Sequence, residues 1–274
     1  MDLFRDRVAV ITGAASGIGL AMAKAVAREG MHVALLDVRR DAVLAAATAV
    51  SVLGVRAIAI ETDVSSEQSV SAAATQVIAE FGKVHLLVNN AAVLVRGGQI
   101  ASTSDEVWDW VLGVNLYGAI HCLRSFLPPI QAHGEGGHLV TMASVSGFAV
   151  GNRQNGVYAA SKFALVGLAE ALAFDLAGTG IGVSVVLPAG VATEIYENSA
   201  QLRGARGGRN LFPSAPQDTQ DGMSPDEMAA RTLDGIRQNR LYVATHPRTR
   251  EMLEARHRAL MEAHDLAEQW RPSS

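Results

Sequence analysis

Seven short runs of β-branched and aliphatic residues alternate with longer alanine-rich segments, and this alternation constrains the fold most strongly. Each run is almost continuously apolar, which is typical of strands buried on both faces in a parallel sheet covered by helices. The predicted strands span residues 7–12, 32–37, 56–61, 84–89, 137–142, 182–187 and 241–245.

The intervening segments carry apolar residues at helical spacing. The predicted helices span residues near 17–29, 41–53, 66–81, 104–132, 157–177 and 225–239. Strand followed by helix, repeated without a separating linker or an internal repeat, predicts an α/β fold. We therefore expect residues 1–274 to form a single domain, a Rossmann-like doubly wound parallel sheet with helices on both faces.

Composition narrows the class of protein further. The chain has 274 residues, of which 49% are hydrophobic, so it can bury one large core. A net charge of −4 without a basic block argues against a nucleic-acid partner. Cys122 is the only cysteine, so we interpret it as a core residue in a reducing compartment. No cleavable signal or membrane-length apolar run is evident, which predicts a cytoplasmic protein without a membrane partner.

One segment, residues 194–224, interrupts the strand and helix rhythm. It is polar, rich in Gly, Pro and Ser, and long for a connection inside a compact domain, which is typical of a functional lid. Its arginines leave two interpretations open, namely contact with an anionic group of a ligand or a solvated lid surface. The arginines are Arg203, Arg206 and Arg209. The segment also carries the large apolar or aromatic residues Tyr196, Leu202, Leu211 and Phe212. A charged C-terminal helical extension is predicted at about 247–270.

The first predicted strand runs into the glycine-rich stretch ITGAASGIG, which contains Gly13, Gly17 and Gly19. Glycine allows a tight turn and a close approach of the backbone to a pyrophosphate, and the following helix N-terminus supplies free N–H groups. The spacing differs from the general Gly-x-Gly-x-x-Gly fingerprint. A simple tight turn is the alternative explanation for this loop.

Asp37 closes the second predicted strand, and it lies at the distance from the glycine loop where an acid meets the adenosine ribose. A carboxylate at this position accepts hydrogen bonds from ribose hydroxyls and repels a 2′-phosphate. The residue therefore favours NAD over NADP as the cofactor. Arg39 and Arg40 follow closely and could accommodate that phosphate, so NADP stays open as an alternative.

Tyr158 and Lys162 stand four residues apart at the start of a predicted helix, so they share one face. A neighbouring ammonium favours the phenolate and would lower the pKa of the tyrosine. A tyrosine tuned in this way can exchange a proton with an alcohol or a carbonyl. The pair predicts acid–base chemistry, with a solvated helix surface as the alternative.

Several motifs occur together in the order that they have in one enzyme family. They are TGAASGIG (12–19), NNAA (89–92), Asn115, MASVSG (142–147) and YAASK (158–162). With these motifs the chain resembles the classical short-chain dehydrogenase/reductase family, well over about residues 5–193 and more loosely to about 245. The resemblance implies an NAD(P)-dependent oxidoreductase that interconverts a secondary alcohol and a ketone. It also implies a homotetramer or dimer that packs through the helices near 104–132 and 157–177.

The resemblance implies a role for each catalytic residue. Tyr158 corresponds to the general acid/base, and Lys162 to the group that lowers its pKa and binds the nicotinamide ribose. Ser144 corresponds to the residue that polarises the substrate oxygen. Asn115 corresponds to the helix residue that holds a water of the proton relay.

The same resemblance implies a set of cofactor contacts. They are Gly13, Ser16, Gly17, Ile18, Gly19, Asp37, Asp63, Val64, Asn89, Tyr158, Lys162, Pro188, Val191 and Thr193. The chain departs from the family pattern at two places. Ala189 stands where the family has a glycine after the proline, and the spacing from Ser144 to Tyr158 is one residue longer than the common version.

Substrate contacts are expected from Ser144, Tyr158, Val95 and Tyr196, with Val93 and Leu94 beside them. Parts of the lid and the YVATHP stretch resemble family members that act on bulky or aromatic secondary alcohols. A 3-oxoacyl-type reductase and a non-catalytic dinucleotide-binding sensor are the alternative functions. His257 and His264 stand seven residues apart with no third ligand in view, so we expect no metal site.

Overall fold

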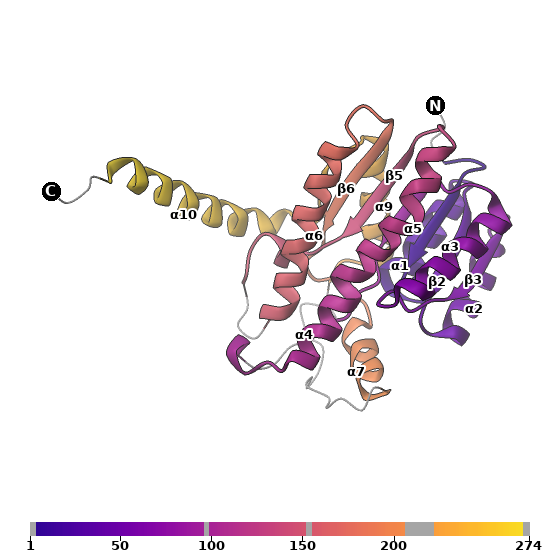
Figure 1. The fold of residues 1–274 in the computed structure, drawn as a ribbon, viewed down its shortest axis with the longest axis horizontal. Helices are drawn as coiled ribbons and strands as arrows, with labels where there is room; N and C mark the ends of the chain where they lie inside the picture. Colours follow the sequence, from indigo (N-terminus) through magenta and orange to yellow (C-terminus); the bar gives the residue numbers. More distant parts are fainter. Residues whose placement is uncertain (1–3, 96–98, 152–154, 206–221, 271–274) are drawn as a thin grey trace.

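The computed structural model describes residues 4–95, 99–151, 155–205 and 222–270. These residues form one seven-stranded sheet in which every neighbouring pair is parallel, with the order β3-β2-β1-β4-β5-β6-β7 (Figure 1). The predicted doubly wound sheet is therefore confirmed. The strands are β1 (Val8–Thr12), β2 (His32–Asp37), β3 (Ala57–Glu61), β4 (Leu86–Asn89), β5 (Gly137–Met142), β6 (Ile181–Leu187) and β7 (Tyr242–Ala244).

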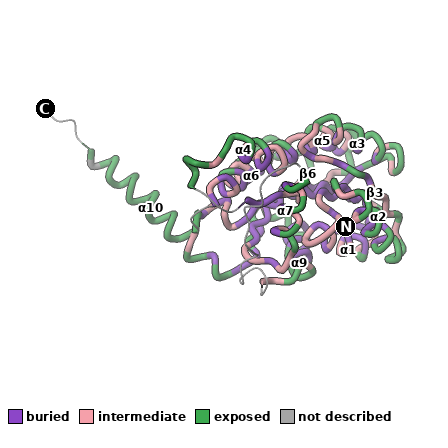
Figure 2. The backbone as a smooth tube through the Cα atoms, turned by 90° about the horizontal axis from the view of Figure 1, so that it is seen from below, coloured by how far each residue is buried: buried purple, intermediate pink, exposed green. Residues whose placement is uncertain are grey.

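Helices cover both faces of the sheet, and the buried residues gather between the layers (Figure 2). One face packs against α1 (Gly17–Arg28), α2 (Arg40–Ser51) and α9 (Pro225–Arg237). The opposite face packs against α3 (Glu67–Phe81), α5 (Gly118–Ala132) and α6 (Gly156–Asp175). The predicted arrangement of helices on both faces is confirmed.

The central strands show why the apolar runs are continuous. Ala9 and Ile11 of β1 pack into the core beneath α1, whereas Val10 packs into the core on the α5 side. Successive side chains of a strand point to opposite faces, so a strand covered on both faces needs apolar residues at every position. Cys122 on α5 is fully buried in the second core, and burial raises the pKa of its thiol to about 12.

The segment predicted as one helix over 104–132 is interrupted in the structure. It consists of α4 (Asp105–Leu112), a π-helical turn (Gly113–Tyr117) and α5. Asn115 lies within the π-helical turn, which inserts an extra residue into the helical hydrogen-bonding pattern. Such turns often occur at functional sites, and periodicity alone does not predict them.

The segment predicted as a lid begins with a helix, α7 (Ile195–Ala205). Arg206, Arg209, Leu211 and Phe212 lie outside the described residues. The C-terminal end of the segment lies beside the residues that precede it, because the N–H of Met223 donates to the carbonyl oxygen of Gly190 at 3.0 Å. The two ends of the lid segment are therefore held together beside β6.

The predicted C-terminal helix corresponds to α10 (Arg250–Gln269), which projects from the rest of the molecule (Figure 1). Three short 3₁₀ turns complete the described elements. They are η1 (Ile100–Ser102), η3 (Val145–Gly147) and η4 (Pro247–Thr249).

Helix α6 has an unusual composition for a surface-layer helix. It is apolar around most of its circumference, and its length and mean hydropathy of 1.5 would suffice to cross a membrane. Core helices share this composition, and α6 packs against β5, β6 and η3 while it carries the buried Lys162. Its outer side nevertheless exposes Phe174, which indicates an apolar surface that the described chain does not cover.

Substitution of Gly137 tests the close packing at the start of β5. A Cβ there would lie 2.7 Å from Cγ2 of Ile130 and 2.9 Å from the carbonyl oxygen of His85. We expect Gly137→Ala to lower the free energy of unfolding by roughly 1–3 kcal/mol, because the neighbours must shift to admit the methyl group. Gly204→Ala on α7 is the control, since none of the residues that the structure describes comes within 4 Å of its Cβ position. Equal denaturation midpoints for both variants would contradict the packing.

Candidate active site

The candidate site lies at the carboxyl ends of the strands, where the strand order reverses between β1 and β4. Ligands bind at this position in open α/β sheets. Two cavities of about 320 and 470 Å³ lie side by side there. The first is lined by residues that include Gly13, Gly17, Asp37, Asp63 and Val64. The second is lined by residues that include Ile18, Ser144, Tyr158, Lys162, Val191 and Thr193.

The glycine loop forms the floor between the two cavities. Gly13 and Gly17 have φ angles of +62° and +53°, a left-handed conformation that favours glycine. A Cβ on Gly13 would lie 2.9 Å from Cα of Ala91, and one on Gly19 would lie 2.2 Å from the carbonyl oxygen of Gly13. Ser16 precedes α1 without a side-chain capping bond. The first-turn N–H groups are therefore available to an anion, and the loop fits a pyrophosphate.

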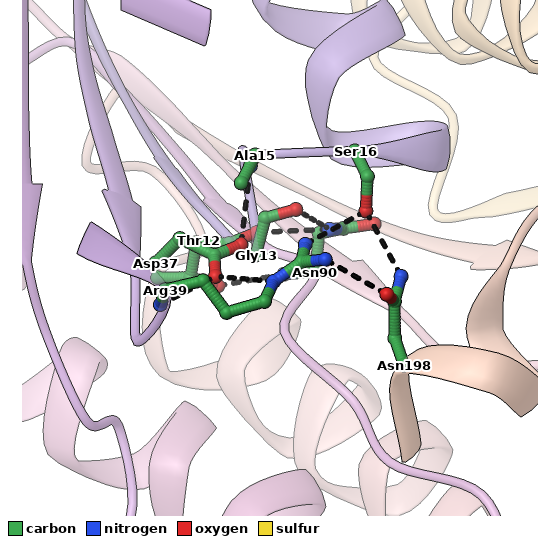
Figure 3. Close-up of polar contacts among 8 residues, drawn as sticks. All are labelled: Thr12, Gly13, Ala15, Ser16, Asp37, Arg39, Asn90 and Asn198. Carbon is green, nitrogen blue, oxygen red and sulfur yellow. Dashed lines mark hydrogen bonds and ion pairs between the residues drawn. The ribbon is translucent and has the colours of Figure 1, made fainter. Parts of the chain in front are cut away.

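Thr12 and Asn90 brace this loop from below (Figure 3). Nδ2 of Asn90 donates to the carbonyl oxygens of Thr12 at 2.8 Å and Gly13 at 3.3 Å. The hydroxyl oxygen of Thr12 accepts the N–H groups of Asn90 and Ala91, both at 3.0 Å. The ends of β1 and β4 are thus joined directly beneath the place where a pyrophosphate would lie.

Asp37 lies at the end of β2 with only 6% of its surface exposed, and it is part of a polar cluster (Figure 3). Its carboxylate accepts the N–H of Ala15 at 3.1 Å and the N–H and Nε of Arg39 at 3.0 and 3.2 Å. Arg39 also donates to Ser16 Oγ and to Asn198 Oδ1, each at 2.8 Å. Helix α7 is therefore joined to the glycine loop through Asn198 and Arg39.

The remaining predicted contacts of the first cavity divide into two groups. Asp63 and Val64 line it, and Oδ1 of Asp63 accepts both the N–H and the hydroxyl of Ser65. Asn89 lies behind the wall, whereas Asn90 lines both cavities. Oδ1 of Asn89 is buried without a hydrogen-bond partner in the described part of the chain.

The second cavity brings Ser144, Tyr158 and Lys162 together. Ser144 follows β5, where its Oγ accepts the N–H of Ser146 at 3.1 Å, and the other two residues lie in the first turns of α6. Nζ of Lys162 donates to the carbonyl oxygen of Met142 at 2.8 Å and lies 5.4 Å from the centre of the Tyr158 ring. A phenol, an ammonium and a hydroxyl therefore meet at one wall of one cavity.

Burial dominates the proton affinities at this wall. It raises the pKa of Tyr158 to about 12, and the effect is opposed by a hydrogen bond to Ser144 and increased by Tyr196. It lowers the pKa of Lys162 to about 7, because the buried ammonium is desolvated. The expected lowering of the Tyr158 pKa by Lys162 is therefore not found, and the pKa is shifted upward instead. Near neutral pH the free site holds a protonated phenol.

Asn115 anchors the segment behind this wall. Its Oδ1 accepts the N–H of Val93 at 2.8 Å, and its Nδ2 donates to the carbonyl oxygen of Val93 and to Ser161 Oγ, both at 3.0 Å. Ser161 Oγ in turn donates to the carbonyl oxygen of Tyr158 at 2.7 Å. These contacts give Asn115 a positioning function for the first turn of α6.

The turn after β6 contains the departure from the family pattern at Ala189. Its N–H donates to Nδ1 of His246 at 3.2 Å, so Nε2 of His246 carries the hydrogen that is donated to the carbonyl oxygen of Gly190 at 3.0 Å. The carbonyl oxygen of Pro188 accepts the N–H of Val145 at 2.7 Å. The turn is therefore held by η3, which follows β5, and by His246, which follows β7, and sequence reasoning missed the contribution of His246.

The outer wall of the second cavity differs in part from the expectation. Tyr196 lines it, but Val95 is buried in an apolar cluster with Trp110 and lies outside the lining, which Leu94 joins instead. The guanidinium of Arg203 lies 5.6 Å from the Trp110 ring centre and does not line either cavity.

Asn155 is a polar residue of the wall that sequence reasoning missed. It lines the second cavity, and its Oδ1 is buried without a hydrogen-bond partner among the described residues. Its position in the segment between Ser144 and Tyr158 was the available signal, because that segment carries the additional residue.

A third cavity, of about 530 Å³, lies at the amino ends of the strands, and its lining includes His85 and Glu135, which form a group with His133. These three residues have the composition of a metal site. However, Nδ1 of His85 accepts the N–H of Val8, and its Nε2 bonds Glu135 at 3.0 Å. Nε2 of His133 bonds the carbonyl oxygen of Val84 at 2.8 Å, and its Nδ1 accepts the N–H of Glu135. Each ring nitrogen is already committed, so the group does not fit a metal ion.

Comparisons with known proteins agree with this geometry. A family model described as short chain dehydrogenase matches residues 7–203. The C alpha-dehydrogenase of Sphingobium sp. (strain NBRC 103272 / SYK-6) is 35% identical over 270 residues, which cover 96% of this chain and 88% of that protein. The 1-deoxy-11-beta-hydroxypentalenate dehydrogenase of Streptomyces exfoliatus is 33% identical, with coverage of 87% and 82%.

A solved structure of a short chain dehydrogenase/reductase from Burkholderia phymatum in complex with NAD is also similar. It has a TM-score of 0.87 and 35% sequence identity, and the match covers 100% of this chain and 99% of that chain. Fold and site thus define an oxidoreductase that acts on an alcohol or a carbonyl group with a nicotinamide dinucleotide. The chain belongs to the short-chain dehydrogenase/reductase family.

The buried Lys162 ammonium makes stability depend on pH. Its pKa falls from 10.5 to about 7 in the folded protein, so between these values the unfolded chain binds a proton that the folded chain has lost. The free energy of unfolding then rises with pH across this window. We expect the cofactor-free protein to gain thermal stability from pH 7 to pH 9, and Lys162→Met to lose most of this gain. Lys24→Met on α1 is the control, and an unchanged slope in Lys162→Met would contradict the effect.

Proposed function

We propose that the protein is an NAD-dependent dehydrogenase or ketoreductase that interconverts a secondary alcohol and a ketone, with Tyr158 as general acid/base. The observation that carries the proposal is the meeting of Ser144, Tyr158 and Lys162 at one wall, beside a glycine loop that fits a pyrophosphate.

The residues of the cavity divide the reaction between them. When bound, a nicotinamide supplies or accepts the hydride at the carbon that bears the oxygen. Ser144 holds the substrate oxygen beside the phenol of Tyr158. In reduction the phenol gives its proton to that oxygen, and in oxidation the phenolate removes the proton of the alcohol.

The protonation states of Tyr158 and Lys162 decide which direction of the reaction, reduction or oxidation, the site favours. Because burial raises the pKa of Tyr158, the free site is set to donate a proton, which is the requirement of reduction. Oxidation needs the phenolate, and a positive charge on Lys162 stabilises it. Lys162 is oriented for this by its hydrogen bond to the carbonyl oxygen of Met142.

The preference for NAD is supported by Asp37. Its carboxylate is buried at the edge of the first cavity, where it would meet the ribose hydroxyls and repel a 2′-phosphate. Arg39 is bound to that carboxylate and to Ser16 and Asn198, so its guanidinium has partners that a phosphate would have to replace.

A bulky or aromatic alcohol is the substrate class that the second cavity supports best. Its outer wall is formed by large side chains, among them Leu94, Tyr196 and Met252, and its volume is about 470 Å³. One relative is a dehydrogenase of 1-deoxy-11-beta-hydroxypentalenate, whose name supports a hydroxyl-bearing substrate for this chain as well. A 3-oxoacyl-type reductase is the second candidate, because a similar structure is a 3-ketoacyl-(acyl-carrier-protein) reductase complexed with NADH at 26% identity.

Assembly into a homo-oligomer, a tetramer or a dimer, is part of the proposal. The outer side of α6 is apolar and bears small residues, among them the exposed Ala160, Gly167 and Ala171 next to Phe174. A helix that is apolar around most of its circumference needs cover on its outer side as well. A second copy of the chain would provide that cover without exposing a polar group to an apolar surface.

Tyr158→Phe tests the mechanism directly. We expect kcat to fall on the order of 10²–10⁴-fold, because the proton donor is removed, while NADH binding changes little. Wild type and variant are assayed over aliphatic, aromatic, steroid, polyol and acyl-thioester alcohols with NAD and with NADP. Tyr117→Phe is the matched control, since Tyr117 is 53% exposed and lies outside the cavity lining.

Two outcomes of that assay would count against the proposal. Near-wild-type turnover by Tyr158→Phe would show that another group transfers the proton. A wild-type protein that binds NADH but turns over none of the substrates would favour a non-catalytic dinucleotide-binding sensor.

The cofactor preference is tested by direct titration with NADH and NADPH. We expect tighter binding of NADH by the wild type. Asp37→Ser should raise the affinity for NADPH on the order of tenfold, because one like-charge repulsion is removed and Arg39 is released. The double variant Asp37→Ser/Arg39→Met should lose that gain. Wild-type binding of NADPH at least as tight as that of NADH would refute the preference.

A further inference from the structure

Helix α10 leaves the body at the rim of the second cavity and extends away from it (Figure 1). Its first two turns remain close to the domain, since Met252 lines that cavity and the guanidinium of Arg256 lies 5.4 Å from the Phe163 ring centre. From Leu253 to Glu268 every residue is exposed (Figure 2). In proteins most of the stability of a helix comes from packing of its apolar side, and the 20 residues of α10 have little such packing beyond its start. A partner that covers the helix would supply that packing.

One side of α10 carries an apolar stripe at seven-residue spacing. This repeat is typical of a helix that packs along another helix. Arg256 interrupts the stripe and lies on the same side. The stripe consists of Met252, Leu253, Ala259, Leu260, Ala263, Leu266, Ala267 and Trp270. The side that begins against α6 thus continues as an apolar surface beyond the body, where three of its residues are 46–68% exposed, namely Leu253, Leu260 and Leu266.

The charges of α10 are divided between its two halves. All three arginines of the helix, Arg250, Arg256 and Arg258, lie in the first half, with Glu251 and Glu254 beside them. The second half carries Glu262, Asp265 and Glu268 and no lysine or arginine. A second α10 in the antiparallel direction would place its acidic half against the basic half of the first. A parallel pair would place like charges together.

We propose that α10 is an association arm whose apolar stripe is covered by α10 of a second copy of this chain, in the antiparallel direction. The same surface then serves both copies across a two-fold axis, as in most dimeric contacts between identical chains. The small side chains of Ala259 and Ala263 allow the two helices to approach closely near the centre of the stripe. This association does not depend on the proposed reaction. It would place a second subunit beside the rim of each catalytic cavity.

Leu260→Glu and Met261→Glu form the decisive pair of variants. The two residues are adjacent and equally exposed, at 47% and 48%, but Leu260 lies in the stripe and Met261 on the opposite side. We expect Leu260→Glu to halve the assembly mass measured by analytical ultracentrifugation of the full chain, and Met261→Glu to leave it unchanged. The same mass for both variants, whether wild-type or halved, would overturn the proposal. So would a wild-type monomer that co-sediments with vesicles of anionic phospholipid.

Single cysteines test the direction of the pair, because Cys122 is fully buried and does not interfere. In an antiparallel pair that crosses near the centre of the stripe, two copies of Ala259→Cys lie close enough for a disulfide, whereas two copies of Ala267→Cys lie about 20 Å apart. We expect an oxidised cross-link between subunits at position 259 and none at position 267. Cross-linking at both positions would indicate a parallel pair, and cross-linking at neither would refute pairing through α10.

Discussion

The contact between the carboxyl ends of β1 and β4 is the constraint on which the site depends. Gly13 lies so close to Ala91 that a side chain would not fit between them, and Asn90 binds the backbone of β1 from the other strand. This contact holds the ends of β1 and β4 together beneath the glycine loop, at the point where the strand order reverses. The crevice above it is therefore fixed by backbone and amide groups, before any variable side chain contributes.

The sequence predicted the features that depend on local pattern. Continuous apolar runs located the strands, since a strand covered on both faces has few polar positions, and i, i+4 spacing placed Tyr158 and Lys162 on one side of α6. The glycine pattern identified the loop because its conformations and close approaches exclude side chains. Each of these properties is set by residues close together in the chain.

The features that sequence reasoning missed depend on contacts between distant segments. Helical periodicity continues through residues 104–132, so the π-helical turn at Asn115 appears only once Val93 and Ser161 are placed beside it. The link from Arg39 to Asn198 spans 159 residues of chain. The pKa of Tyr158 was expected to fall because the lysine is near in sequence, but desolvation outweighs that effect once the whole cavity encloses both groups.

The two walls of the second cavity come from different kinds of element. The wall with Ser144, Tyr158 and Lys162 is attached to the sheet, whereas the outer wall comes from peripheral helices and turns. Ser144 lies two residues after the end of β5, and Lys162 is anchored on the last residue of that strand, so both groups of the proposed mechanism are fixed to the sheet. The outer wall comes from α7, η4 and the first turn of α10, which contribute Tyr196, Arg248 and Met252. Substitutions there can reshape the cavity without moving the wall that carries Ser144, Tyr158 and Lys162, which is how one fold can serve many ligands.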